Sequence, residues 1–342
     1  MKRIHLLFGG LLLATVGALG AGLASRLQPE PRYPFGSSAF DALIRDSENE
    51  TASAKRSGFE TWLANAYSRS PKAQLKGFNS LPAALEARAA AYRKLSSVAM
   101  KVAFERETGQ WLHRMVKATI PKFSLDRGFE FTNTVALGER QCLSQSVLIA
   151  ALLQRIGIDA GMVMIWRNLT GAISNLGHVA VLLKLSDGSA VLVDASEPLP
   201  FPRHQGVFSF NKTLGHYQFL TATFDAKDDI TGFDRATVNE LETLPYRYVR
   251  SQFYFYRGER TPGAFVNKPL TPVGMQKGIA FLKRAVQLEP QNPLAQYVLG
   301  HVYRNAGQID AANTQYKLSR ALFEKFGYVP SGVQAAFDNI KP

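Results

Sequence analysis

GERQCLSQSVLIAALLQRIGIDAGMVMI, residues 138–165, is the stretch that decides how the chain folds. A helix is predicted over residues 142–156, and it is apolar on nearly all of its faces, which is typical of a helix buried in a core. Gly157 ends this helix, and the apolar residues 159–166 then predict a strand. The stretch therefore predicts a buried helix that leads directly into a sheet.

Three residue types suited to acyl chemistry fall at the ends of the elements predicted here. Cys142, the only cysteine, opens the buried helix, where the unpaired amides and positive dipole end lower the pKa of a thiol. His178 opens a strand predicted over 178–185, and Asp194 follows a strand predicted over 190–193. A histidine can hold the thiol proton and a carboxylate can orient the histidine. The alternative is that Cys142 is a small apolar residue of the core.

The blocks GERQCLSQSVLIAALLQRIGIDAGMVMI and GHVAVLLKLSDGSAVLVDAS resemble the transglutaminase-like superfamily over about residues 111–196. That family has a cysteine opening a helix, a histidine beginning a strand and an aspartate ending the next, in this order. The resemblance implies a papain-like fold, in which the cysteine helix packs on an antiparallel sheet. It also implies that Cys142 is the nucleophile, His178 the general base and later acid, and Asp194 the orienting carboxylate.

The triad places a condition on the loop between the last two strands. If Asp187 and Gly188 formed a regular two-residue turn, Asp194 would lie opposite Val181 and face away from His178. A bulge or a loop of odd length is required, and Gly188 suits a bulged loop.

Other polar residues near these elements are weaker candidates. An oxyanion hole would use the Cys142 amide and a second donor, for which Gln141 is the nearest side chain, although a solvent-facing Gln141 is the alternative. His204 and His216 could line the cleft, or could be ordinary core or surface histidines. The remaining histidines lie without a metal-ligand partner at useful spacing, so no metal and no cofactor are predicted.

The N-terminus carries an export signal. Lys2 and Arg3 precede an uncharged apolar run over residues 4–24, so residues 1–25 are predicted to be a signal peptide or an uncleaved membrane anchor. Residues 26–38, with three prolines after Leu27, predict a linker. Either alternative places the body outside the cytoplasm, in the periplasm or an equivalent extracytoplasmic space, soluble or anchored.

Residues 39–260 are expected to form a helical lead-in followed by the transglutaminase-like domain, whose core spans 105–200. Helical periodicity dominates residues 39–120. The aromatic run YRYVRSQFYFY at 246–256 predicts a strand. The fold class predicted for the whole chain is α+β.

Residues 271–342 predict a C-terminal tetratricopeptide-like helical hairpin. The residues that fall at the spacing of such a repeat are Leu299, Gly300, Tyr303, Gly307, Ala312 and Tyr316, with Ala285 and Pro290 at the end of a preceding unit. One repeat and half of another are too few for a free-standing solenoid, so we expect the hairpin to dock on the catalytic domain. An ordinary helical hairpin is the alternative.

Composition narrows the possible functions. The net charge of +13 suggests anionic envelope partners or simply a solvated basic surface, and no basic run interleaved with aromatics indicates nucleic-acid binding. We therefore expect an exported or membrane-anchored cysteine hydrolase that acts on amide bonds of a peptide or protein, by hydrolysis or acyl transfer. The alternative is an inactive binding or assembly protein of the cell envelope, which recruits a protein partner through its repeat.

Overall fold

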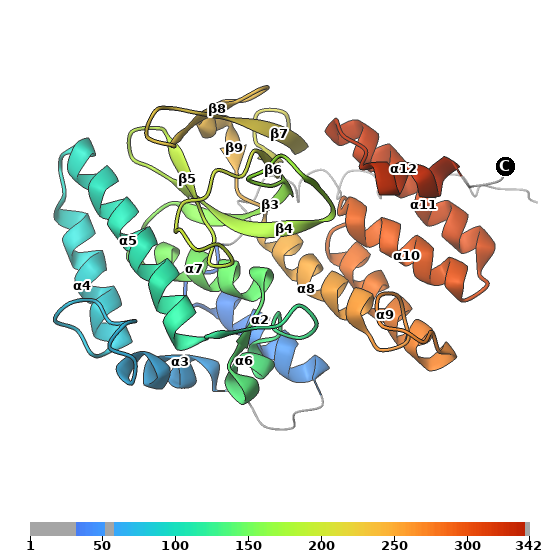
Figure 1. The fold of residues 1–342 in the computed structure, drawn as a ribbon, viewed down its shortest axis with the longest axis horizontal. Helices are drawn as coiled ribbons and strands as arrows, with labels where there is room; N and C mark the ends of the chain where they lie inside the picture. Colours follow the sequence, from blue (N-terminus) through green and yellow to red (C-terminus); the bar gives the residue numbers. More distant parts are fainter. Residues whose placement is uncertain (1–31, 52–57, 339–342) are drawn as a thin grey trace, which may run out of the picture. The chain divides into compact units, whose positions relative to one another are not determined.

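The computed structural model describes residues 32–51 and 58–338 (Figure 1). The predicted signal or anchor at 1–25 and the first part of the predicted linker lie outside these residues. Among the described helices, none combines the length and the apolar character that crossing a membrane requires. The chain from Arg32 onward forms one compact unit.

Helices come first along the chain, as predicted for the N-terminal region. They are α2 (Ser38–Glu50), α3 (Phe59–Ser68), α4 (Leu81–Lys94), α5 (Val98–Thr119) and the short α6 (Phe131–Leu137). Two short parallel strands, β1 (Lys122–Phe123) and β2 (Glu139–Arg140), flank α6. The predicted mixture of helices and antiparallel strands is confirmed by the elements that follow.

Six antiparallel strands close into a barrel. In chain order they are β3 (Ala160–Arg167), β4 (Ile173–Lys184), β5 (Ala190–Val193), β6 (Gly206–Asn211), β7 (His216–Phe224) and β8 (Ile230–Phe233). The spatial order is β3-β4-β5-β8-β7-β6, and pairing of β3 with β6 closes the ring, while β9 (Leu241–Glu242) extends β6. Alternate residues such as Ile165, Ala180 and Leu192 fill the interior.

The helix that carries the cysteine, α7 (Cys142–Ile156), packs on the outer face of β3 and β4. A capping box begins it: Gln141 accepts from the Leu143 amide, and the Ser144 hydroxyl accepts from the Gln141 amide. Gly157 ends it in the left-handed conformation, as predicted. All residues of α7 except Arg155 are buried, in agreement with its uniformly apolar sequence.

The strand predicted over residues 246–256 is wrong, because this segment belongs to helix α8 (Tyr246–Arg260). Pro245 stands at its N-cap, where proline does not interrupt a helix. Figure 1 shows α8 running between α7 and α9, and its residues are buried almost continuously from Tyr248 to Glu259. The surrounding helices therefore override the strand preference of the aromatic residues.

The described end of the predicted linker is also different from the prediction. Tyr33 is buried, its amide donates to Gln154 Oε1 at 2.9 Å, and its hydroxyl accepts from the Met162 amide at 3.3 Å. The Phe35 amide donates to the Ala151 carbonyl at 2.9 Å. Residues 32–38 are held against α7 by these contacts and do not act as a spacer.

The C-terminal helices are α9 (Pro272–Leu288), α10 (Pro293–Asn305), α11 (Ile309–Phe326) and α12 (Ser331–Asp338). Helices α10 and α11 form a close hairpin, in which Gly300 faces the buried ring of Tyr316. Phe323 and Phe326 of α11 pack on Phe219 and Phe208 of the barrel. The hairpin thus docks on the unit that carries the cysteine, as expected from its short length.

Candidate active site

Cys142 is the first residue of α7 and only 5% of its surface is exposed. As the first helical residue it has a backbone amide with no acceptor inside the helix, and it lies at the positive end of the helix dipole. The thiol accepts a hydrogen bond from the Val179 amide of β4. The sulfur therefore lies beside the middle of β4 (Ile173–Lys184), the strand that carries the predicted histidine; this strand begins five residues before His178, where the sequence predicted its start.

The loop condition set by the sequence is met. The Leu185 amide donates to the Ser189 carbonyl at 2.8 Å, so the loop proper holds three residues, and Gly188 has the positive φ of 89° expected of a bulged loop. The strands pair Val181 with Val193, and the next pair along this register would place Asp194 opposite residue 180. Asp194 and His178 therefore share one face of the sheet.

Asp194 holds His178 directly. His178 Nε2 lies 2.6 Å from Asp194 Oδ2, and the Ser196 amide donates to Oδ1 at 2.8 Å. The carboxylate is completely buried. Burial raises the pKa of Asp194, but the hydrogen bonds from His178 and His204 outweigh burial and hold it well below its usual value. The carboxylate is thus ionised and oriented toward the imidazole.

Cys142 and His178 are hydrogen-bonded to each other and form an acid–base pair. Since Nε2 of His178 is taken by Asp194, Nδ1 is the ring nitrogen left for the hydrogen bond with the thiol. Burial lowers the pKa of His178, but the partners Asp194 and Cys142 raise it to about 11. Burial raises the pKa of Cys142, and the hydrogen bond and charge of His178 reverse this, so the thiol pKa is lowered. The arrangement favours a thiolate beside an imidazolium.

Sequence reasoning missed Tyr256, whose hydroxyl lies 3.8 Å from Cys142 Sγ. Burial, followed by the neighbouring charge of Cys142, raises the pKa of Tyr256 well above its ordinary value, so it stays protonated and can donate. Its ring stacks on Phe129 and lies under the Arg260 guanidinium. The residue was hidden because its segment was predicted as a strand, which would have placed it elsewhere.

His204 supplies a second hydrogen bond to the same carboxylate oxygen. His204 Nε2 lies 2.9 Å from Asp194 Oδ2, and the residue is 1% exposed. From the sequence, His204 and His216 could either line the cleft or be ordinary core or surface histidines. His216, the other, bonds the Tyr217 carbonyl and stacks on Phe326, outside this cluster.

The ligand atoms of His178, Asp194 and His204 lie within 4.8 Å of one another, so they could in principle hold a metal ion. The orientation of the two imidazole rings fits a hydrogen-bonded network better than a metal site. Both imidazoles direct Nε2 at one carboxylate oxygen, at hydrogen-bonding distances. A metal-bound histidine generally gives its other ring nitrogen to an acceptor, whereas the buried His204 Nδ1 has no partner among the described residues.

Gln141 is not placed as an oxyanion donor. It is fully buried at the N-cap of α7, where its Oε1 accepts from the Leu143 amide and its Nε2 donates to the Leu125 carbonyl, both at 3.4 Å. The side-chain amide therefore joins the helix start to the loop before α6. The backbone amide of Cys142 remains as a donor at this position, and the Tyr256 hydroxyl lies 3.8 Å from the sulfur.

No protein-family model matches this chain, and no curated protein matches its sequence. Among solved structures the chain is similar to one described as "Crystal structure of menin reveals the binding site for Mixed Lineage Leukemia (MLL) protein". The TM-score is 0.40 and the sequence identity 11%, over 87% of this chain and 63% of that chain. This chain therefore spans less than two thirds of that protein's length, and so distant a likeness carries no argument about function.

Proposed function

We propose that the protein is a cysteine-dependent hydrolase of the transglutaminase-like type, with a papain-like core, that acts on amide bonds of peptides or proteins. The observation that supports this most is the hydrogen-bonded series Cys142, His178 and Asp194, which lie at the start of α7, within β4 and directly after β5. These residues have the roles and the chain order of the family that the sequence resembles. The export signal predicted at residues 1–25 would place the reaction outside the cytoplasm, with the enzyme soluble or anchored.

The geometry suits a two-step acyl transfer. The Cys142 thiolate attacks the amide carbonyl carbon, and the His178 imidazolium gives its proton to the departing nitrogen as the carbon–nitrogen bond breaks. Water, deprotonated by the now neutral imidazole, then attacks the thioester, and the carbon–sulfur bond breaks to release the acid product and restore the thiolate beside the imidazolium. An amine in place of water would give transfer instead of hydrolysis. In this mechanism the Cys142 amide and the Tyr256 hydroxyl, which lies 3.8 Å from the sulfur, stabilise the oxyanion.

The second candidate is an inactive binding or assembly protein of the cell envelope. It is favoured by the low exposure of Cys142, since a thiol of which only 5% is exposed is poorly accessible to a large substrate. In that case the helical repeat would recruit a protein partner and the buried cluster would only stabilise the fold.

The deciding experiment is the pH dependence of Cys142 alkylation by iodoacetamide. We expect the wild-type protein to react well below pH 8.5, the ordinary thiol pKa, and the His178→Ala variant to react only near that pH. The Cys142→Ala variant measures alkylation at residues other than Cys142. His216→Ala is the matched control for the loss of a histidine. If Cys142 does not react in the folded protein, or if its rate does not change in the His178→Ala variant, the binding-protein alternative is favoured.

A further inference from the structure

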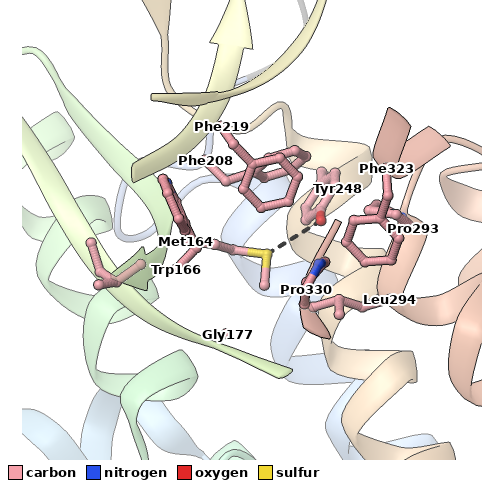
Figure 2. A pocket seen from close by; sticks show the side chains of 11 residues that line it. Met164, Trp166, Gly177, Phe208, Phe219, Tyr248, Pro293, Leu294, Phe323 and Pro330 are labelled. Atoms are coloured by element: carbon pink, nitrogen blue, oxygen red, sulfur yellow. Dashed lines mark hydrogen bonds between the residues drawn. The ribbon is translucent and has the colours of Figure 1, made fainter. Parts of the chain in front are cut away.

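The barrel contacts the surrounding helices in two chemically different ways. Where it meets the C-terminal helices the contact is apolar and closely packed, as Figure 2 shows for Met164, Trp166 and Phe219 against Leu294 and Phe323. The cavity left between these side chains is about 20 Å³, which is room for one water molecule. Apolar packing is thus sufficient to hold helices on this barrel.

The start of α7 contacts the barrel through polar side chains instead. Ser144, Gln145 and Ser146 are three consecutive buried polar residues, on a helix that is apolar over the next seven positions, 147–153. Ser144 belongs to the capping box, but Gln145 and Ser146 take no part in it. Because burying a polar group is unfavourable unless the group is hydrogen-bonded, the partners of these two residues are informative.

Both partners belong to the candidate active site. Ser146 Oγ donates to the Val179 carbonyl at 3.0 Å, and the amide of the same residue donates to the candidate nucleophile. Gln145 Nε2 donates to Ser196 Oγ at 2.6 Å, and the Ser196 amide donates to Asp194 Oδ1 at 2.8 Å. The first turn of α7 is therefore bonded both to the strand beside the thiol and to the segment that carries the orienting carboxylate.

These bonds close a ring that begins and ends on α7. From Cys142 the series runs to His178, to Asp194, to Ser196 and then to Gln145. Gln145 is three residues after Cys142, so the two side chains share one face of the helix. The carboxylate is thereby held at both oxygens, by the two imidazoles at Oδ2 and by the Ser196 amide at Oδ1.

Gln145 also has an unpaired atom. The side chain is fully buried, and its Oε1 has no hydrogen-bond partner among the described residues. A buried acceptor without a donor destabilises a fold, and a methionine, which is unbranched and of similar size, would fill the site without this penalty. Helix packing alone therefore does not explain an amide at this position, whereas the bond to Ser196 does.

We propose that Gln145 is a positioning residue of the reaction, which acts through Ser196 to fix the Asp194 carboxylate relative to the thiol on the same helix. This inference rests on the proposed function. Asp194 lies directly after β5 and beyond its last pair with β4, so strand pairing does not hold it. The bond from α7 supplies this constraint. Without it, the Ser196 amide can move away from Oδ1 and the carboxylate orients the imidazole less firmly.

The test is the pH profile of Cys142 alkylation by iodoacetamide, measured on the full chain. Gln145→Met keeps the volume and removes the bond. A carboxylate that is held less firmly stabilises the His178 imidazolium less, so the thiolate should form at higher pH. We expect the midpoint of the profile to rise by about half a unit to one unit, and the rate below the wild-type midpoint to fall about three- to tenfold. At high pH, where the thiol is fully ionised, the rate should equal that of the wild type.

Variants at Ser196 test the same bond from its other end. Ser196→Ala removes the hydroxyl but keeps the amide that reaches Asp194, so it should give the same shift as Gln145→Met. The double variant should add little to either single variant, because both remove one interaction. Ser196→Thr retains the hydroxyl and should return the profile to that of the wild type.

Gln154→Met is the matched control for the loss of a buried glutamine. Gln154 lies at the opposite end of α7, where its Oε1 accepts from the Tyr33 amide and its Nε2 donates to the Ala160 carbonyl, both at 2.9 Å. Its replacement should lower the free energy of unfolding in urea but leave the pH profile unchanged.

The outcomes separate the two proposals. The positioning role is overturned, and the proposed function stands, if the wild-type thiol reacts at low pH but neither Gln145→Met nor Ser196→Ala moves the profile. The same holds if Gln154→Met moves the profile equally, or if the effects of the two single variants add in full. Should Gln145→Met not fold, Ser196→Ala alone decides. If the wild-type thiol reacts only near its ordinary pKa of about 8.5, the proposed function fails and the positioning role fails with it.

Discussion

Two half-buried histidines in this molecule, His178 and His301, have opposite acid–base character. His178, beside the barrel, has its pKa raised to about 11, whereas burial, followed by the nearby positive charge of Arg304, lowers the pKa of His301 in the repeat to about 4. Burial pushes both toward the neutral form. At His178 the hydrogen bonds and negative charges of Asp194 and Cys142 outweigh burial and raise the pKa. His301 has no such anionic partner among the described residues around it and lies among the rings of Tyr297, Tyr316 and Phe265.

This contrast distinguishes the candidate active site from the packing of the C-terminal helices. Around His178 the polar atoms converge on one carboxylate, and the hydrogen bonds keep opposite charges together in the interior. Around His301 the contacts are aromatic, and its Nε2 is buried with no hydrogen-bond partner among the described residues. A buried histidine alone is therefore a weak sign of function, and its anionic partners are the informative feature.

The largest expected effect comes from removing the charge that distinguishes the two histidines. In Asp194→Asn the pKa of His178 should fall by several units toward that of His301, and the thiol pKa should rise by about two units or more. Labelling of Cys142 at pH 6 would then decrease about 100-fold, in proportion to the thiolate fraction. The measurement is the iodoacetamide rate from pH 4 to 10, together with the NMR titration of His178.

The matched control for this variant is Asp310→Asn, which makes the same chemical change at an exposed position of α11. It should leave the labelling profile unchanged. An Asp194→Asn profile that overlays the wild type would mean that the carboxylate does not set the state of His178, and the contrast between the two histidines would need another cause.

His301→Phe tests the other side of the comparison. Because the folded pKa of His301 is depressed to about 4 from an ordinary 6.5, the stability linked to this group is present above pH 6.5 and is lost as the pH falls toward 4. The variant cannot bind the proton, so it should avoid a loss of about 2–3 kcal/mol between pH 7.5 and 4.5. Urea unfolding at both pH values measures this difference.

Tyr297→Phe is the control within the same aromatic cluster. It removes the hydrogen bond from the Tyr297 hydroxyl to the Gly332 carbonyl, so its cost should be similar at both pH values. If His301→Phe loses as much stability in acid as the wild type, protonation of His301 does not contribute and its environment is less apolar than its contacts indicate.

His204 is expected to have a smaller effect, acting as a positioning residue for Asp194. Loss of a hydrogen bond to a buried charged group costs about 1.5–3 kcal/mol, so His204→Leu should raise the pKa of Asp194 and slow Cys142 labelling at pH 6 about tenfold. His204→Gln, which retains a donor, should recover much of the rate. Equal rates in Leu, Gln and wild type would assign His204 to packing alone.

The sequence was sufficient for features that depend on local periodicity. The buried helix at Cys142, its end at Gly157 and the hairpin that follows were predicted because each depends on neighbours within a few residues. The sequence also states the condition that this loop must meet, a bulge or an odd length, since alternation along a strand fixes which side chains share a face, but the loop itself comes only from the structure.

Features that depend on distant segments could not be predicted. Tyr256 reaches the thiol because α8 packs beside α7. The aromatic residues of this segment favour a strand, and only packing against the neighbouring helices makes the segment helical. His204 lies just before β6, and β6 is held in the barrel by pairing with β3, whose partner residues are 39 to 44 positions away in the sequence. Tyr33 packs on α7 from a segment whose prolines indicated a linker.

The smallest predicted effect concerns Gly300, at which the sequence predicted a close approach of two helices. In most helices Gly→Ala stabilises by about 1 kcal/mol, but a Cβ here would lie 2.8 Å from two ring carbons of Tyr316 and 3.3 Å from the Ala312 carbonyl oxygen. Tyr316 is 1% exposed, so its ring has little room to move. The overpacking cost of about 1–3 kcal/mol should therefore exceed the gain in helix propensity, and Gly300→Ala should lower the free energy of unfolding by about 1 kcal/mol.

Gly232→Ala on β8 is the control, because the nearest atom to its added Cβ is 3.8 Å away, and it should be close to neutral in the same urea titration. A stabilised Gly300→Ala protein would show that α10 and α11 can separate without cost. In that case the repeat would be loosely packed, in contrast to the tightly hydrogen-bonded cluster around His178.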